Sequence, residues 1–202
     1  MLIDDYIDYQ IKYQEKYGEK TVILMQVGSF FEAYAIDNDK EKVNIDNLNQ
    51  ICDLMNIQIS RKSKSVIENS RSNPLMAGFP LFAIEKFIQI LMNHGYTVVL
   101  IEQVTEPPEP ERKVTNIFSP GTSITYTPSE ETSNLLSIYI ETTKDLKNYR
   151  DIVCVGLSII DLTTGKSIIY EMYSDGDDIN KSFDEIYRFI QSHNPKEIVL
   201  NV

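Results

Sequence analysis

Several residue types are scarce in this sequence of 202 residues, and each scarcity excludes a class of protein. The two cysteines, Cys52 and Cys154, are too far apart for a zinc knuckle and too few for a disulfide scaffold, so we expect free, buried thiols. The two histidines, His94 and His193, have no Asp, Cys or Ser in a catalytic spacing and are expected to be structural or surface residues. No glycine-rich phosphate-binding loop with Lys and Ser or Thr is present, so we predict no nucleotide held in that way. We also assign no catalytic residue and no metal site.

Positive charge and long apolar runs are also scarce. Lys plus Arg number 19 against 30 Asp plus Glu, a net charge of -11, so the surface as a whole cannot be a basic mantle for nucleic acid. Any anionic partner must therefore be bound locally. Asp4, Asp5 and Asp8 stand where a signal peptide would be basic and then apolar, and no apolar run has the length of a membrane span. We expect an intracellular protein without membrane contact.

Apolar periodicity predicts a first domain, residues 1–118, in which a small mixed sheet is flanked by helices. Helical spacing occurs over 4–17, 44–55 and 81–94, with Phe82 among the inward residues. Strand-like runs occur over 21–27, 30–36, 97–101 and 114–118, with a shorter one at Ile57 and Ile59. Gly28-Ser29 divides the first two runs, which are one bent strand or two short ones. The polar residues 60–73 are expected to form a mobile loop.

Residues 119–133 are rich in Ser, Thr, Pro and Glu, a composition typical of a linker. A second domain is expected over 134–202. Its strand candidates are 135–140, 152–160, 166–173 and 197–202, and a helix is expected over 183–190. The order βββαβ places the chain in the α/β (α+β) class, with the second domain incomplete.

Residues 27–35 are the most informative segment. In an extended strand, alternation places Phe30, Glu32 and Tyr34 on one face and their odd-numbered neighbours on the other. An aromatic ring and a carboxylate about 7 Å apart, just after a glycine turn, could insert between bases and accept a hydrogen bond from a base edge. The alternative is that Phe30 belongs to the core and Glu32 points to water.

One segment concentrates positive charge. Arg61, Lys62, Lys64 and Arg71 lie within eleven residues, with Glu68 as the sole acid between them. A polar loop of this charge could follow a phosphate backbone, or it could be no more than a solvated loop.

Motifs along nearly the whole chain resemble those of the DNA mismatch-recognition proteins of the MutS type. Residues 28–32, Gly-Ser-Phe-Phe-Glu, are similar to the family's Gly-Asp-Phe-Tyr-Glu motif, and residues 76–80, Met-Ala-Gly-Phe-Pro, to its Met-Ala-Gly-Ile-Pro motif. Further similarities follow in the family's order at 95–99, 102–103, 112–114, 119–122, 134–136 and 161–165. The resemblance identifies residues 1–118 with the mismatch-binding domain and 134–202 with the start of the ribonuclease-H-like connector domain.

The resemblance implies roles for two residues. Phe30 matches the aromatic that enters the minor groove and stacks on a mispaired or unpaired base, and Glu32 matches the carboxylate that hydrogen-bonds that base. A flawed base step resists kinking less than a paired one, so one wedge can detect many errors. A proton shared between Glu32 and the base is a further hypothesis. Ser29 and Phe31 depart from the bacterial motif but leave both contacting side chains in place.

The resemblance also implies what this chain works with. We expect an N-terminal fragment that binds duplex DNA with mismatches or small loops and holds no cofactor, while ATP and Mg belong to an ATPase domain beyond residue 202. A second MutS-type subunit and a MutL-type protein are the expected protein partners, and the expected location is the cytoplasm or wherever the genome is replicated. The 27 isoleucines and four alanines indicate an AT-rich genome, and with the divergent motif they suggest a branch such as that of large DNA viruses.

Two other classes of function stay open. A ribonuclease-H-like nuclease needs several converging carboxylates, of which only Asp161 stands plausibly at a strand end. A protein-interaction module without DNA contact would bury Phe30, so the exposure of that side chain separates it from the DNA-binding hypothesis.

Overall fold

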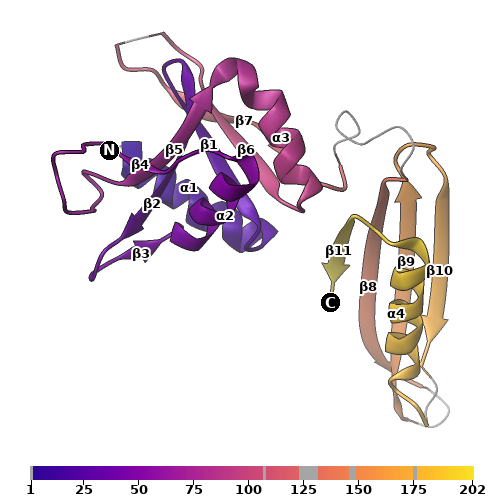
Figure 1. The fold of residues 1–202 in the computed structure, drawn as a ribbon. Coiled ribbons are helices and arrows are strands. Elements are labelled where there is room, and N and C mark those ends of the chain that lie inside the picture. Colours follow the sequence, from indigo (N-terminus) through magenta and orange to yellow (C-terminus); the bar gives the residue numbers. More distant parts are fainter. Residues whose placement is uncertain (1, 107, 123–131, 146–148, 175–176) are drawn as a thin grey trace. The chain divides into compact units, whose positions relative to one another are not determined.

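The computed structural model describes all residues except 1, 107, 123–131, 146–148 and 175–176. It divides the chain into two compact units, Met1–Ser119 and Pro120–Val202 (Figure 1). Each unit has its own sheet and its own helices, so the α/β class predicted from the sequence is confirmed. None of the helices within the described part of the chain is long and apolar enough to cross a membrane.

The first unit is built on one mixed sheet. Its strands are β1 (Thr21–Val27), β2 (Phe30–Asp37), β3 (Lys42–Val43), β4 (Ser60–Arg61), β5 (Leu75–Pro80), β6 (Thr97–Gln103) and β7 (Arg112–Phe118). Its helices are α1 (Leu2–Tyr17), α2 (Ile45–Met55) and α3 (Ile84–Asn93), the last preceded by the 3-10 turn η1 (Leu81–Ala83). The strand order is β4-β5-β2-β1-β6-β7, with β3 beside β2, and β1 and β6 form a parallel pair.

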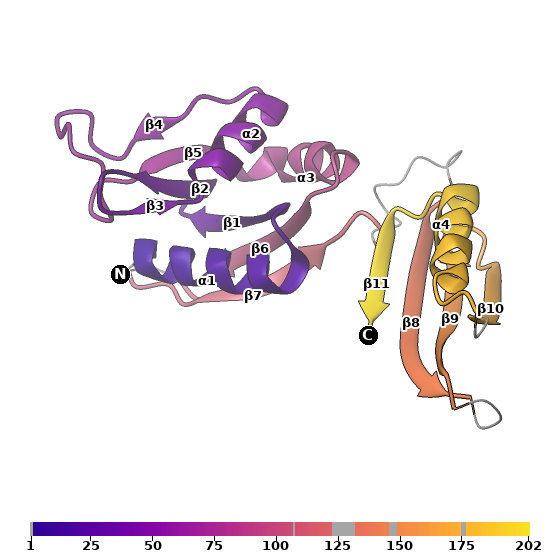
Figure 2. The same ribbon diagram turned by 90° about the horizontal axis from the view of Figure 1, so that it is seen from below.

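Helices cover both faces of this sheet. Figure 2 shows α1 on one side and α2 and α3 on the other. On the α3 side, the Phe79 ring lies 6.2 Å from the Phe31 ring and 4.3 Å from the Phe87 ring, between centroids. On the α1 side, the fully buried Tyr6 packs edge-on against Tyr34, with centroids 5.1 Å apart. The central strands β1 and β6 and most of β2 are therefore buried on both faces, and this fixes the strands that carry the candidate site.

A buried glutamine joins α1 to β1. β1 pairs with β2 only over its last three residues, which leaves backbone groups near its start without a strand partner on that side. Gln10, 1% exposed, donates Nε2–H to the Thr21 carbonyl at 2.7 Å and accepts the Ile23 N–H at 3.1 Å. Because an unpaired buried backbone group is costly, this side chain takes the place of a strand.

Of the two alternatives for residues 21–36, two short strands is the correct one, because Gly28-Ser29 forms a turn and the runs on either side pair with each other. Two other predictions for the first unit are wrong. Ile57 is part of the end of α2, where its N–H bonds the Cys52 carbonyl, and the short strand lies at Ser60–Arg61 instead of at the isoleucines. Phe82 is 89% exposed because it precedes α3 in a 3-10 turn, out of phase with the helix.

The polar segment after β4 is organised by two buried asparagines. Asn73, 3% exposed, accepts the Ser63 N–H at 2.7 Å and donates to the carbonyls of Val66 and Glu68. Asn69, 8% exposed, accepts the Asp37 N–H at 2.8 Å, which ties the loop to the end of β2. The expectation of a mobile loop overlooked these bonds, because a single amide side chain can satisfy three backbone groups.

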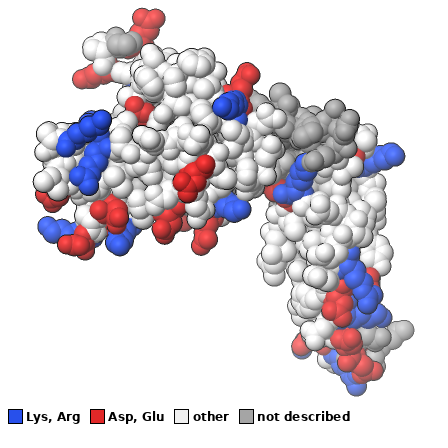
Figure 3. All heavy atoms as spheres, viewed as in Figure 1, with Lys and Arg blue, Asp and Glu red and all other residues white. Residues whose placement is uncertain are grey.

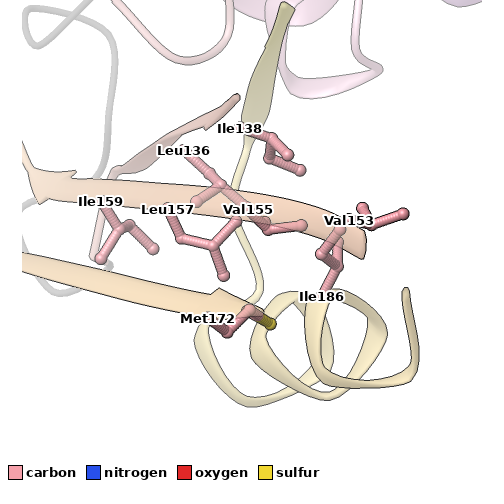
Figure 4. Close-up of a cluster of buried hydrophobic side chains, with 8 residues drawn as sticks. All are labelled: Leu136, Ile138, Val153, Val155, Leu157, Ile159, Met172 and Ile186. Atoms are coloured by element: carbon pink, nitrogen blue, oxygen red, sulfur yellow. The ribbon is translucent and has the colours of Figure 1, made fainter. Parts of the chain in front are cut away.

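The second unit has the predicted βββαβ order. It consists of β8 (Asn134–Lys144), β9 (Asp151–Asp161), β10 (Ser167–Tyr173), α4 (Lys181–His193) and β11 (Glu197–Asn201). The strand order is β10-β9-β8-β11, with β11 parallel to β8. Figure 4 shows the core between this sheet and α4. Its buried side chains are Leu136, Ile138, Val153, Val155, Leu157, Ile159, Met172 and Ile186.

Two described residues of the predicted linker, Gly121 and Ser133, are hydrogen-bonded within the second unit. The Gly121 N–H donates to Glu197 Oε2 at 3.0 Å, and a Cβ on Gly121 would lie 2.4 Å from the Cβ of Glu197. Ser133 is fully buried and donates its N–H to Asp161 Oδ1 at 3.2 Å. The rest of the predicted linker, residues 123–131, lies outside the described residues.

Candidate functional site

The candidate site begins at the turn between β1 and β2. Val27 pairs with Phe30, so Gly28 and Ser29 form a two-residue loop. Gly28 has φ +60 and Ser29 is outside the left-handed region, the φ pattern of a type II′ turn, which places glycine first. The Ser29 carbonyl accepts the Leu81 N–H at 3.1 Å, which fixes the turn to the end of β5.

Phe30 is exposed at this turn. Its side chain is 45% exposed, whereas its neighbour Phe31 is 3% exposed, as strand alternation predicts. The interpretation that places Phe30 in the core is therefore wrong. A large ring left partly in water beside a tight turn carries apolar surface that a partner could cover.

Glu32 lies two residues along on the same face of β2 and is partly buried. Its Oε2 accepts a short hydrogen bond from the hydroxyl of Tyr34. On the neighbouring strand Gly78 stands opposite Glu32, and a Cβ on Gly78 would lie 3.0 Å from Cγ of Glu32 and 3.0 Å from the Phe31 carbonyl oxygen. The carboxylate is therefore held by a hydroxyl, and the absence of a side chain at Gly78 leaves room for the Cγ of Glu32.

Tyr34 is buried, at 3% exposure. Burial raises the pKa of its hydroxyl far above the ordinary value, and the hydrogen bond to Glu32 raises it further. Arg112 lowers it in part through its positive charge, and this arginine also donates Nε–H to the Gln26 carbonyl at 2.9 Å on β1. The hydroxyl therefore stays protonated and can act as a donor at neutral pH.

The four predicted phosphate-binding residues fall into two groups. Arg61, Lys62 and Lys64 are exposed at β4 and just after it. Arg71 instead donates to Glu41, with the shortest bond 2.6 Å, and to Asp4 Oδ1 at 2.8 Å. Figure 3 shows basic side chains gathered at the end of the first unit where Figure 1 places β4 and its loop.

The remaining sequence candidates have structural roles. Asp161 accepts hydrogen bonds from Thr163 and Thr164 in the β9–β10 turn. In the ranges that the structure describes, no three His, Cys, Asp or Glu side chains are grouped to hold a metal ion. His94 and His193 each approach a carbonyl at a helix end, at 2.8 and 3.0 Å. Cys52 is buried as expected and Cys154 is half-buried, and both are free.

Sequence reasoning missed two features of the site. One is the hydrogen bond from the Tyr34 hydroxyl to Glu32, because strand alternation places both side chains on one face but does not show that they are bonded. Gly78 stands opposite Glu32 through the pairing of β2 with β5, which no local pattern reveals. The exposed Phe82 directly follows Leu81, whose N–H donates to the Ser29 carbonyl.

Comparison with known proteins identifies the family of this chain. The family described as MutS domain I matches residues 7–127, which is more than half of the chain. The chain belongs to this MutS family, and the resemblance predicted from its motifs is confirmed.

One relative is a protein of Acanthamoeba polyphaga mimivirus named as a putative DNA mismatch repair protein mutS homolog. It is 36% identical over 196 residues, which are 96% of this chain and 17% of the relative. The DNA mismatch repair protein MutS of Chlorobium phaeobacteroides is 29% identical over 183 residues, 89% of this chain and 18% of the relative. That of Fervidobacterium nodosum is 27% identical over 203 residues, 98% of this chain and 20% of the relative. The chain thus spans about a fifth of the length of these relatives.

Proposed function

We propose that this chain recognises mispaired or unpaired bases in double-stranded DNA. Phe30 enters the minor groove at the flawed step and stacks on the base, while Glu32 hydrogen-bonds that base. The observation that carries the proposal is the exposure of Phe30 at a rigid turn with a held carboxylate two residues along the same strand face.

The physical basis is the cost of opening a base step. Inserting a ring costs a few kcal/mol of unstacking, and a mispaired or unpaired step has already lost part of that stability. Stacking on an aromatic side chain returns about 1–3 kcal/mol and is available from any base. Phe30 therefore reads deformability, and Glu32 adds a hydrogen bond that a base in a regular pair cannot offer as readily.

Phosphate contacts would come from the exposed cations of the β4 loop. Arg61, Lys62 and Lys64 can contact the backbone without giving up an internal ion pair, because none is found for them among the described residues. Arg71 is held by Glu41 and Asp4, so its contribution is to keep the loop in place.

In the whole protein, this chain would act as the reader of a MutS-type mismatch repair ATPase. ATP and Mg would be bound by other parts of that protein, and the residues of this chain would perform no catalysis. A second MutS-type subunit and a MutL-type protein would be its protein partners.

The proposal is tested by a low-salt NMR titration of the 202-residue chain with two DNA duplexes of matched sequence. One duplex is fully paired and the other carries a single unpaired thymine. We expect chemical-shift changes concentrated at residues 28–34 only with the flawed duplex. Phe30→Ala should weaken binding to that duplex about tenfold or more, since it removes the stacking.

The matched control is Tyr17→Ala, which removes another partly exposed aromatic at the far end of β1, where α1 stops. Its binding should equal that of the unmodified chain. Equal responses to both duplexes, or full affinity in Phe30→Ala with its fold intact, would show that Phe30 is not the reader.

A further inference from the structure

Three side chains on one face of β2 are in three different environments. Phe30 is 45% exposed, Glu32 is partly buried and Tyr34 is 3% exposed. Exposure thus falls along the strand from the turn into the core. Tyr34 is therefore held in the core, whereas Phe30 is accessible to a partner.

Tyr34 is fixed from more than one side. Its ring packs edge-on against Tyr6 at 5.1 Å and 80°, and its carbonyl accepts a hydrogen bond of 2.8 Å from Asn44 Nδ2. A buried aromatic with these contacts has one position for its hydroxyl. That hydroxyl donates to Glu32 Oε2, so the fixed ring determines where the carboxylate lies.

The bond leaves one carboxylate oxygen for a ligand. A carboxylate has two oxygens, and the Tyr34 hydroxyl is bonded to Oε2. Oε1 receives no hydrogen bond from any residue that the structure describes. On the neighbouring strand, the absence of a Cβ at Gly78 leaves room for the Cγ of Glu32. One oxygen is anchored and the other is available.

We propose that Tyr34 is a positioning residue, whose hydroxyl holds Glu32 so that Oε1 meets the displaced base, and that it thereby sets the preference for flawed over paired DNA. This inference rests on the function proposed above. Without the hydroxyl, the Glu32 carboxylate would lose the hydrogen bond that orients it and would have to be ordered again at each binding event. That ordering cost falls on the base contact, which only the flawed duplex makes.

The test is Tyr34→Phe, which keeps the ring and removes only the hydroxyl. We expect the ratio of affinities for the unpaired-thymine duplex and the paired duplex to fall about three- to tenfold, with affinity for the paired duplex unchanged. Tyr6→Phe is the matched control, because it removes a buried tyrosine hydroxyl that donates to the Ile23 carbonyl and not to Glu32. The ratio of affinities for the two duplexes in Tyr6→Phe should equal that of the unmodified chain.

A double-mutant cycle distinguishes positioning from a general loss of structure. In a Glu32→Ala background, Tyr34→Phe should change the ratio no further, because the hydroxyl then has no carboxylate to hold. An equal loss with and without Glu32 would mean that the hydroxyl acts through the fold alone, and the inference would be overturned.

A second readout needs no DNA. The 13C chemical shift of the Glu32 carboxyl carbon should move in Tyr34→Phe and stay unchanged in Tyr6→Phe. If the unmodified chain discriminates and Tyr34→Phe matches it, the role of Tyr34 is refuted while the proposed function stands. If the unmodified chain does not discriminate at all, both are refuted.

Discussion

At the scale of single residues, Gly78 leaves the space that the Glu32 side chain occupies. The two residues face each other across paired strands, and the glycine lacks the one atom that would meet both Cγ of Glu32 and the Phe31 carbonyl oxygen. Alternation within β2 was enough to predict from sequence that Phe30 and Glu32 share a face. It could not predict the role of Gly78, because that depends on which distant strand pairs with β2 and in which register.

Gly78→Ala should therefore damage both the fold and the site. Its Cβ would lie 3.0 Å from a backbone oxygen that cannot move without disturbing the β2–β5 pair. We expect the free energy of unfolding in urea to fall by about 1 kcal/mol or more, as for other overpacked positions. The preference for the flawed duplex should fall as well, since Glu32 is displaced.

Gly156→Ala is the control for this substitution. Gly156 lies within a strand of the second unit, where an added Cβ would meet only Tyr139 Cβ at 3.9 Å. We expect little change in either measurement. A Gly78→Ala chain as stable and as selective as the unmodified one would show that Glu32 is not confined from that side.

At the scale of elements, the sequence predictions failed at turns and helix ends. Long apolar runs such as β1 and β6 were predicted nearly to the residue, because continuous burial leaves a plain signal. β4 has two exposed residues and exists only through pairing with β5, so its own sequence carried no signal. The loop after it takes its shape from Asn69 and Asn73, which resemble ordinary loop residues until their partners are known.

The β9–β10 turn should show a measurable pH dependence. Hydrogen bonds from Thr164 and Thr163 lower the pKa of Asp161 from 3.8 to about 2. A lowered pKa means that the folded state favours the carboxylate, so its stabilisation is complete above about pH 4 and is lost as the pH falls toward 2. Asp161→Asn should therefore lower the free energy of unfolding at pH 7. In urea titrations, the difference in this free energy between the variant and the unmodified chain should shrink as the pH falls from about 4 toward 2.

Asp39→Asn provides the baseline for these titrations. Asp39 is exposed between β2 and β3, and within the described ranges no hydrogen bond reaches its carboxylate. The two substitutions should differ at pH 7 and converge near pH 2. A constant difference from pH 7 to 2 would exclude the hydrogen-bonded carboxylate as its source.

At the scale of the whole molecule, charge and recognition are separated. The net charge of -11 opposes binding to DNA, while the aromatic reader itself is uncharged. Composition therefore excluded a basic mantle, and motifs were needed to find the site. Arg61, Lys62 and Lys64 are exposed cations in one loop of the first unit. We expect the isolated chain to bind DNA weakly and with a dependence on salt set by those few contacts.

Salt titration measures the number of phosphate contacts directly. Three phosphate contacts predict a slope of log K against log salt of about -3, and removal of one contact in Lys62→Ala should reduce its magnitude by about 1. Paired and flawed duplexes should lose affinity equally, because a phosphate contact carries no information about the base. Lys166→Ala, the same charge change on an exposed lysine of the second unit, should leave the slope unchanged. Tight binding that resists salt would contradict this assignment.

The stacking of Phe30 on the displaced base is tested most directly by intermolecular NOEs. The sample is the 202-residue chain at low salt, saturated with the duplex that carries one unpaired thymine. We predict cross-peaks from the Phe30 ring protons to the thymine methyl group and the adjacent base protons, and none with the paired duplex. A saturated complex in which the Phe30 ring resonances stay unperturbed and show no contact with any base would contradict the proposed function.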